Sequence, residues 1–204
     1  MPVRWPIRCG TDLSVKTGES GLMPMEEKIA TLGMLMVPHF SVSLDEVRLK
    51  TGKVSRRLRI DHPKAVAIVP VMEDRQIVMV RQFRYAVGKE TLEVPAGKVD
   101  KGESVESAVR RELMEETGYQ AGKLIRLLSY CPAIAYSNEV IEIFAVTNLD
   151  KAGQPLDIDE ISSVEIKPLS ELIDMISSGE IVDGKTIISL LIIEKWFQSG
   201  KLRP

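Results

Sequence analysis

Apolar and polar residues alternate over the first third of the chain, between residues 29 and 60. The alternation runs through residues 40–49, is interrupted by the turn-forming pair Thr51-Gly52, and returns over residues 54–60. A period of two places successive side chains on opposite faces of a strand. This stretch therefore predicts a small antiparallel sheet of about three strands.

Longer apolar runs follow and predict the strands of a buried sheet. The first run, Ala65–Val71, is almost wholly apolar, which is typical of a central strand covered on both faces. Further strands are predicted at Ile77–Val80, Thr91–Val94, Lys123–Tyr130, Glu139–Val146 and Val164–Ile166, and helices at Leu169–Ser177 and Gly184–Gln198. The pattern thus predicts a mixture of strands and helices.

The most informative stretch is a predicted helix between Ser104 and Gly118. Ser104 suits the N-cap position, and Gly118 suits a left-handed stop. Apolar residues spaced for one helix face lie between them, at Val105, Ala108, Val109 and Leu113. At about 100° per residue, Glu112 and Glu116 fall within this apolar stripe rather than opposite it.

Carboxylates on an inward helix face need a cationic partner. Burying an ionised carboxylate is costly, and two carboxylates one turn apart repel each other. A divalent cation bound by Glu112 and Glu116, with Glu115 at the edge of the stripe, removes both costs. Clustered carboxylates favour Mg²⁺ or Mn²⁺, whereas Zn²⁺ prefers the Cys and His residues that this stretch lacks. The alternative is an acidic helix face in contact with water.

The same residues resemble the Nudix box at every fixed position of that motif. The matching positions are Gly97, Glu103, Arg111-Glu112-Leu113, Glu115-Glu116 and Gly118-Tyr119. Upstream, residues 82–85 (Gln-Phe-Arg-Tyr) and 93–97 (Glu-Val-Pro-Ala-Gly) resemble runs of the ADP-ribose and nucleotide-sugar branch. The resemblance implies an α/β fold of the Nudix type, an α/β/α sandwich with a mixed sheet, plus a small N-terminal antiparallel β-sheet.

The resemblance also implies roles for residues in and near the box. Glu112, Glu115 and Glu116 would hold metal, joined by the backbone carbonyl near Ala96, and Glu115 and Glu116 would thereby serve catalysis. The structural residues of the box would be Gly97, Glu103, Arg111 and Gly118, with Glu103 and Arg111 paired to brace the loop against the helix.

A separate general base is expected on a loop well after the box, as is common in this branch. The acidic loop that contains Asp157, Asp159 and Glu160 fits that description, and Glu160 is the favoured catalytic residue. A solvated acidic turn is the alternative interpretation of this loop.

Three further residues are candidates for binding the substrate. Arg81 and Arg84 come from the strand before the box, and a guanidinium group matches the oxygens of a phosphate. Glu139 follows residues 136–138 (Tyr-Ser-Asn), as an acid does in many relatives.

Composition and charge divide the chain and limit its partners. Residues 1–24 show no periodicity and are expected to be disordered or an extension. The resemblance to Nudix pyrophosphatases implies that residues 25–62 are an N-terminal β-sheet dimerisation region and that residues 63–204 are the Nudix hydrolase domain. A net charge of −2 gives no broad basic field for nucleic acid, and no apolar run is long enough to span a membrane. Cys9 and Cys131 do not form a disulfide framework, so a cytoplasmic protein with reduced thiols is expected.

The resemblance implies a Mg²⁺- or Mn²⁺-dependent pyrophosphatase that converts ADP-ribose to AMP and ribose 5-phosphate, as a homodimer formed through the N-terminal sheet. Ile134 stands where ADP-ribose hydrolases usually place a proline, so another nucleoside diphosphate sugar stays open as the substrate. A non-catalytic module that senses a nucleotide sugar is the alternative from a different class of protein. The intact set of Glu112, Glu115 and Glu116 argues against that alternative.

Overall fold

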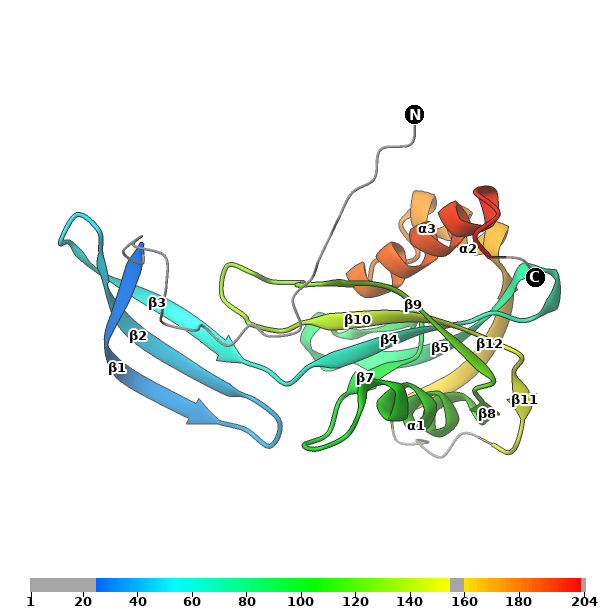
Figure 1. The fold of residues 1–204 in the computed structure, drawn as a ribbon, viewed down its shortest axis with the longest axis horizontal. Helices are drawn as coiled ribbons and strands as arrows, with labels where there is room; N and C mark the ends of the chain where they lie inside the picture. Colours follow the sequence, from blue (N-terminus) through cyan, green and yellow to red (C-terminus); the bar gives the residue numbers. More distant parts are fainter. Residues whose placement is uncertain (1–24, 155–159, 203–204) are drawn as a thin grey trace.

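An antiparallel sheet of three strands forms the N-terminal part of the structure, which is a computed structural model describing residues 25–154 and 160–202. The strands are β1 (Glu26–Met36), β2 (Ser41–Leu49) and β3 (Val54–Asp61), in the order β1-β2-β3. This sheet projects away from the remainder of the molecule (Figure 1). The predicted N-terminal sheet is confirmed, whereas the expectations for residues 1–24 lie outside the described residues.

A mixed sheet of four strands forms the centre of the larger part. Its order is β7 (Ala96–Lys98), β4 (Ala65–Pro70), β10 (Ile141–Thr147) and β9 (Lys123–Tyr130), and only the β4–β10 pair is parallel. Helix α1 (Val105–Thr117) lies on one side of this sheet, and helices α2 (Leu169–Ser178) and α3 (Gly184–Gln198) lie on the other (Figure 1). The predicted α/β/α sandwich is confirmed.

A second antiparallel sheet has the order β12 (Ile161–Pro168), β5 (Gln76–Arg84) and β6 (Lys89–Glu93). The remaining short elements are the paired strands β8 (Tyr119–Gln120) and β11 (Asp150–Lys151) and the 3₁₀ turns η1 (Glu73–Arg75) and η2 (Tyr85–Val87). The strand predicted at Val164–Ile166 is present and extends further at both ends. β12 runs from Ile161 to Pro168 because it pairs with β5 from Gln82 to Gln76.

Strand β4 supports both helical layers because all six of its residues are buried. Val66 and Ile68 belong to the apolar cluster that includes Ala108, Val109 and Leu113 of α1. Ala65, Ala67 and Val69 belong to the cluster that includes Leu190 and Ile193 of α3. Successive side chains of a strand point to opposite faces, so one uninterrupted apolar run serves two layers.

The helices begin and end where the sequence places capping residues. The Ser104 side chain accepts a hydrogen bond from the Ser107 amide at 3.1 Å, and Gly118 ends α1 with φ of 74°. Asp183 caps α3 by accepting from the Thr186 amide at 3.0 Å. Within the described residues, no helix is long and apolar enough to cross a membrane.

Glu93, the last residue of β6, links strand β5 to helix α3 although its side chain is only 2% exposed. Arg84 of β5 donates to its two carboxylate oxygens at 2.8 and 2.5 Å, Thr91 donates at 2.6 Å, and Lys185 of α3 donates to one of the same oxygens. Burial alone would raise the pKa of Glu93, but Arg84 and Lys185 lower it to about 2. A buried carboxylate thus stays ionised because two cations from different elements meet it.

Substituting Glu93 by glutamine tests this link through the pH dependence of the free energy of unfolding at acid pH. The carboxyl pKa is about 2 in the folded protein against 4.5 for an ordinary glutamate, so its stabilising effect is present above pH 4.5 and is lost as the pH falls toward 2. Glu93→Gln should lower the free energy of unfolding at neutral pH by roughly 3 kcal/mol. It should also flatten the pH dependence in that acid window, measured by urea unfolding.

The control for this measurement is Glu171→Gln, which breaks an exposed ion pair with Lys167. An exposed pair contributes at most about 1 kcal/mol, so this variant should unfold much like the parent protein. If the free energy of unfolding changed with pH equally in the parent protein and in Glu93→Gln between pH 2 and 4.5, the role given to Glu93 would be contradicted.

Candidate active site

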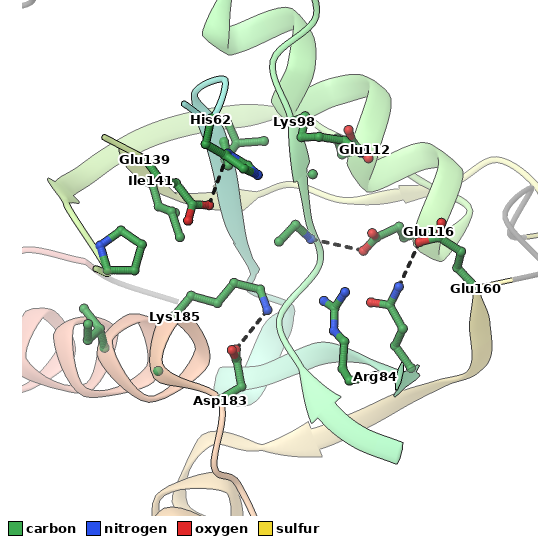
Figure 2. A pocket seen from close by; sticks show the side chains of 18 of the residues that line it. His62, Arg84, Lys98, Glu112, Glu116, Glu139, Ile141, Glu160, Asp183 and Lys185 are labelled. Carbon is green, nitrogen blue, oxygen red and sulfur yellow. Dashed lines mark hydrogen bonds and ion pairs between the residues drawn. The ribbon is translucent and has the colours of Figure 1, made fainter. Parts of the chain in front are cut away.

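A cavity of about 700 Å³ opens where α1, the central sheet, β5 and the start of α3 meet. The close view in Figure 2 shows side chains from all these elements around it. Its lining includes most of the residues singled out in the sequence, namely Arg84, Ala96, Gly97, Arg111, Glu112, Glu115, Glu116, Glu139 and Glu160. Residues that are more than 70 positions apart in the chain, Arg84 and Glu160 among them, are brought to one site.

The acidic wall of this cavity is formed by Glu112 and Glu116 on the inner face of α1. Glu116 is 6% exposed, and its carboxylate accepts a hydrogen bond from the Ala96 amide at 3.1 Å. Burial raises the pKa of Glu116 to about 8, opposed by the Ala96 amide and reinforced by the charge of Glu112. Burial likewise raises the pKa of Glu112. Both carboxylates therefore lie on the inward face, as the helical spacing predicted.

Arg111 connects the two ends of the box. Its guanidinium donates to both carboxylate oxygens of Glu103 at 3.0 and 2.9 Å, and to the Lys98 carbonyl at 2.9 Å. It also donates to Glu112 at 2.8 Å and to Glu115 at 3.1 Å. Arg111 lowers the pKa of Glu103, so this carboxylate is held ionised against the loop.

Two glycines of the box occupy places that a side chain cannot share. A Cβ atom at Gly97 would lie 1.9 Å from Cδ of Glu112, so any larger residue would displace this carboxylate. A Cβ atom at Gly118 would lie 2.5 Å from the Gly153 carbonyl oxygen, and the residue has φ of 74°. Gly97 thus makes room for a carboxylate of the site, whereas Gly118 makes room for backbone.

The acidic wall fits a divalent cation in chemistry, although its side chains are not gathered around one. Within residues 25–154 and 160–202, no three Asp, Glu, His or Cys side chains are grouped to hold a metal ion. Arg111 draws the carboxylates of Glu112 and Glu115 toward itself, and both would turn from it to reach a cation beside Glu116. Buried carboxylates with raised pKa values are compensated by hard cations that prefer oxygen ligands, such as Mg²⁺ and Mn²⁺.

The cationic wall contains Arg84, as predicted, and Lys185, which the sequence interpretation missed. Arg81 lies outside the lining, and its Nε donates to Glu165 at 2.7 Å. Side chains alternate along β5, so Arg81 and Arg84, three positions apart, point to opposite faces of that strand. Lys185 had no local signal, because a single lysine at the start of a helix is ordinary in sequence.

The remaining wall carries the other predicted acids. Glu160 accepts a hydrogen bond from Nε2 of Gln82 at 2.9 Å, whereas Asp157 and Asp159 lie outside the described residues. Glu139 faces His62 with 3.7 Å between a carboxylate oxygen and Nδ1. His62 also lines the cavity.

The loop that leads to Glu139 is joined to the end of β3. The Ile60 amide donates to the Tyr136 carbonyl at 2.7 Å, and the His62 amide donates to the Asn138 side chain at 2.8 Å. The ring of Phe40, from the β1–β2 connection, lies 5.8 Å from the ring of His62. The N-terminal sheet is thus attached directly to one wall of the cavity.

The chain is similar in sequence and in fold to known proteins. A model of the NUDIX domain matches residues 61–188. The chain is 33% identical to an ADP-ribose pyrophosphatase of Bacillus subtilis, over 74% of this chain and 83% of that protein. It is also 33% identical to a methanol dehydrogenase activator of Bacillus methanolicus, over 75% of this chain and 84% of that protein.

A solved structure described as an ADP compounds hydrolase superimposes with a TM-score of 0.72, covering 85% of this chain and 96% of the other. At 24% sequence identity, this likeness shows the shared fold. The family model spans the box, the acidic helix and the residues that line the cavity. This chain therefore belongs to the NUDIX domain family and is a Nudix hydrolase.

Proposed function

We propose that this protein is a divalent-metal-dependent pyrophosphatase that hydrolyses ADP-ribose to AMP and ribose 5-phosphate. The observation that carries the proposal is one cavity in which the carboxylates of α1 lie opposite Arg84 and Lys185. A diphosphate bridge is anionic and resists attack by water, so its cleavage needs both neutralisation of charge and an oriented water. The similarity to an ADP-ribose pyrophosphatase supports this choice of substrate.

The carboxylates of Glu112, Glu115 and Glu116, with the backbone near Ala96, would hold Mg²⁺ or Mn²⁺. When bound, the cation supplies charge neutralisation for the diphosphate and acidifies a water molecule. Arg111 would hold Glu103 against the loop, whereas Glu112 and Glu115, which accept hydrogen bonds from Arg111, would turn from it toward the cation.

Three other residues act on the substrate side in this proposal. Arg84 presents a guanidinium edge to the diphosphate while Glu93 holds it from behind. Glu160, which is exposed and oriented by Gln82, accepts the proton of the attacking water. Glu139 lies on the wall beside His62, where it accepts hydrogen bonds from sugar hydroxyls.

Glu116→Gln tests the metal assignment with a neutral side chain of the same shape. Hydrolysis of ADP-ribose at saturating Mg²⁺ should fall by about a hundredfold or more, because the most buried carboxylate of the wall is lost. Mg²⁺ should raise the melting temperature of the parent protein, since a ligand stabilises the state that binds it, but not that of the variant.

The matched control is Glu106→Gln, in the exposed first turn of the same helix and outside the cavity lining. This variant should keep both the activity and the stabilisation by Mg²⁺. Turnover of Glu116→Gln at the rate of the parent protein would refute the metal site.

A second part of the proposal is that the protein acts in the cytoplasm as a homodimer, and the N-terminal sheet supports the dimer. Leu44 and Leu58 stand opposite each other on β2 and β3, so they share one face, and they are 39% and 50% exposed. Leu35 and Val54 of the same sheet are also largely exposed. Exposed apolar side chains gathered on a projecting sheet are typical of an interface. We therefore assign dimerisation to residues 25–62 and hydrolysis to residues 63–204.

The double substitution Leu44→Glu with Leu58→Glu should convert dimers to monomers in sedimentation velocity, because four charges would meet across a two-fold interface. Arg59→Glu is the control, since Arg59 points to the opposite face of β3 and should leave the dimer intact. A double variant that sediments as the parent dimer would contradict this assignment.

A further inference from the structure

Lys185, in the first turn of α3, is held between two carboxylates at the edge of the cavity. Its Nζ contacts Glu93 on one side and Asp183 on the other, the latter at 3.0 Å, and its side chain is 12% exposed. The lysine nevertheless lines the cavity (Figure 2). A lysine that served only to neutralise buried Glu93 would not need to reach this surface.

The hydrogen-bond capacity of Lys185 exceeds the two bonds it makes with these carboxylates. An ammonium group carries three N–H donors and no acceptor. One donor is directed to Glu93 and one to Asp183, which leaves a third for a molecule in the cavity. Because both carboxylates fix the four-carbon chain beforehand, little side-chain entropy remains to be lost when a ligand binds.

Arg84 has a matching arrangement on the other side of Glu93. Two of its five N–H donors go to the carboxylate oxygens of Glu93, and the guanidinium lines the same cavity. Thr91 donates to Glu93 from within the sheet and holds the carboxylate in place. One buried carboxylate therefore positions two cations from different elements, β5 and α3, toward a common space.

We propose that Lys185 is a second phosphate-binding residue, which donates a hydrogen bond to the substrate's diphosphate together with Arg84. The proposal rests on the proposed function insofar as the ligand is a nucleoside diphosphate sugar. The acids of α1 lie across the cavity from Lys185 and Arg84 (Figure 2). The diphosphate therefore binds between an acidic wall, which contacts it through metal, and a cationic wall, which contacts it directly. Glu93 is the positioning residue for both cations.

Binding without metal tests this proposal separately from catalysis. Titration calorimetry in the presence of EDTA would compare ADP-ribose with adenosine, which lacks the diphosphate. Lys185→Met should weaken ADP-ribose binding by about tenfold, the equivalent of one hydrogen bond to a charged group, and leave adenosine binding unchanged. Lys185→Arg, which keeps a cation, should recover most of the affinity.

Two further variants separate binding from folding. Lys185→Gln retains an amide donor toward Glu93 or Asp183, and it should lose affinity for ADP-ribose even if Lys185→Met unfolds. Lys167→Met is the matched control, because Lys167 also lies between two carboxylates, Glu165 and Glu171, but outside the cavity. That variant should bind ADP-ribose as the parent protein does.

The outcomes distinguish this inference from the proposed function. Unchanged ADP-ribose affinity in Lys185→Met and Lys185→Gln would overturn the role of Lys185, as would equal weakening of ADP-ribose and adenosine. Failure of the parent protein to bind ADP-ribose without metal would also overturn it. Metal-free binding that depends on Lys185, in a parent protein that does not hydrolyse ADP-ribose with Mg²⁺, would support Lys185 and refute the proposed reaction.

Discussion

The burial of two carboxylates on the inner face of α1 is the constraint on which this site depends. Ala108, Val109 and Leu113 press the helix against β4, and the same helical spacing carries Glu112 and Glu116 toward the sheet. Ionised groups in this position are costly, and their raised pKa values express that cost. The surrounding structure accommodates them through the Ala96 amide, the guanidinium of Arg111 and the missing side chain of Gly97.

On the opposite wall, cationic side chains of the protein compensate a buried carboxylate. Glu93 is almost completely buried but holds a proton weakly, since Arg84 and Lys185 meet it directly. Glu93 is kept ionised by two cationic side chains of the protein, whereas Glu112 and Glu116 would be kept ionised by a bound metal ion. A substrate carrying a diphosphate suits the space between them, because each wall neutralises part of its charge.

Local patterns were sufficient for much of this picture and insufficient for the rest. The strand at Lys123–Tyr130 and the helix at Gly184–Gln198 have the predicted bounds, because capping residues and periodicity act over a few residues. The length of β12 depends on its partner β5, about 80 to 90 residues earlier, and no local signal reports that pairing. The sequence alone could have excluded Arg81 from the cavity lining, because a residue three positions from Arg84 points to the other face of the strand. Lys185 could not have been identified in this way, because only the packing of α3 against β4 and β10 brings it to Glu93.

The most direct test is a chromatographic assay of the purified protein with Mg²⁺ on ADP-ribose, ADP-glucose, GDP-mannose, NADH and nucleoside triphosphates. The account predicts selective, Mg²⁺-dependent release of AMP and ribose 5-phosphate from ADP-ribose, abolished by EDTA. Preferential cleavage of another nucleoside diphosphate sugar would contradict the substrate and keep the metal chemistry. Binding of ADP-ribose with no cleavage of any of these compounds would contradict the catalytic account itself.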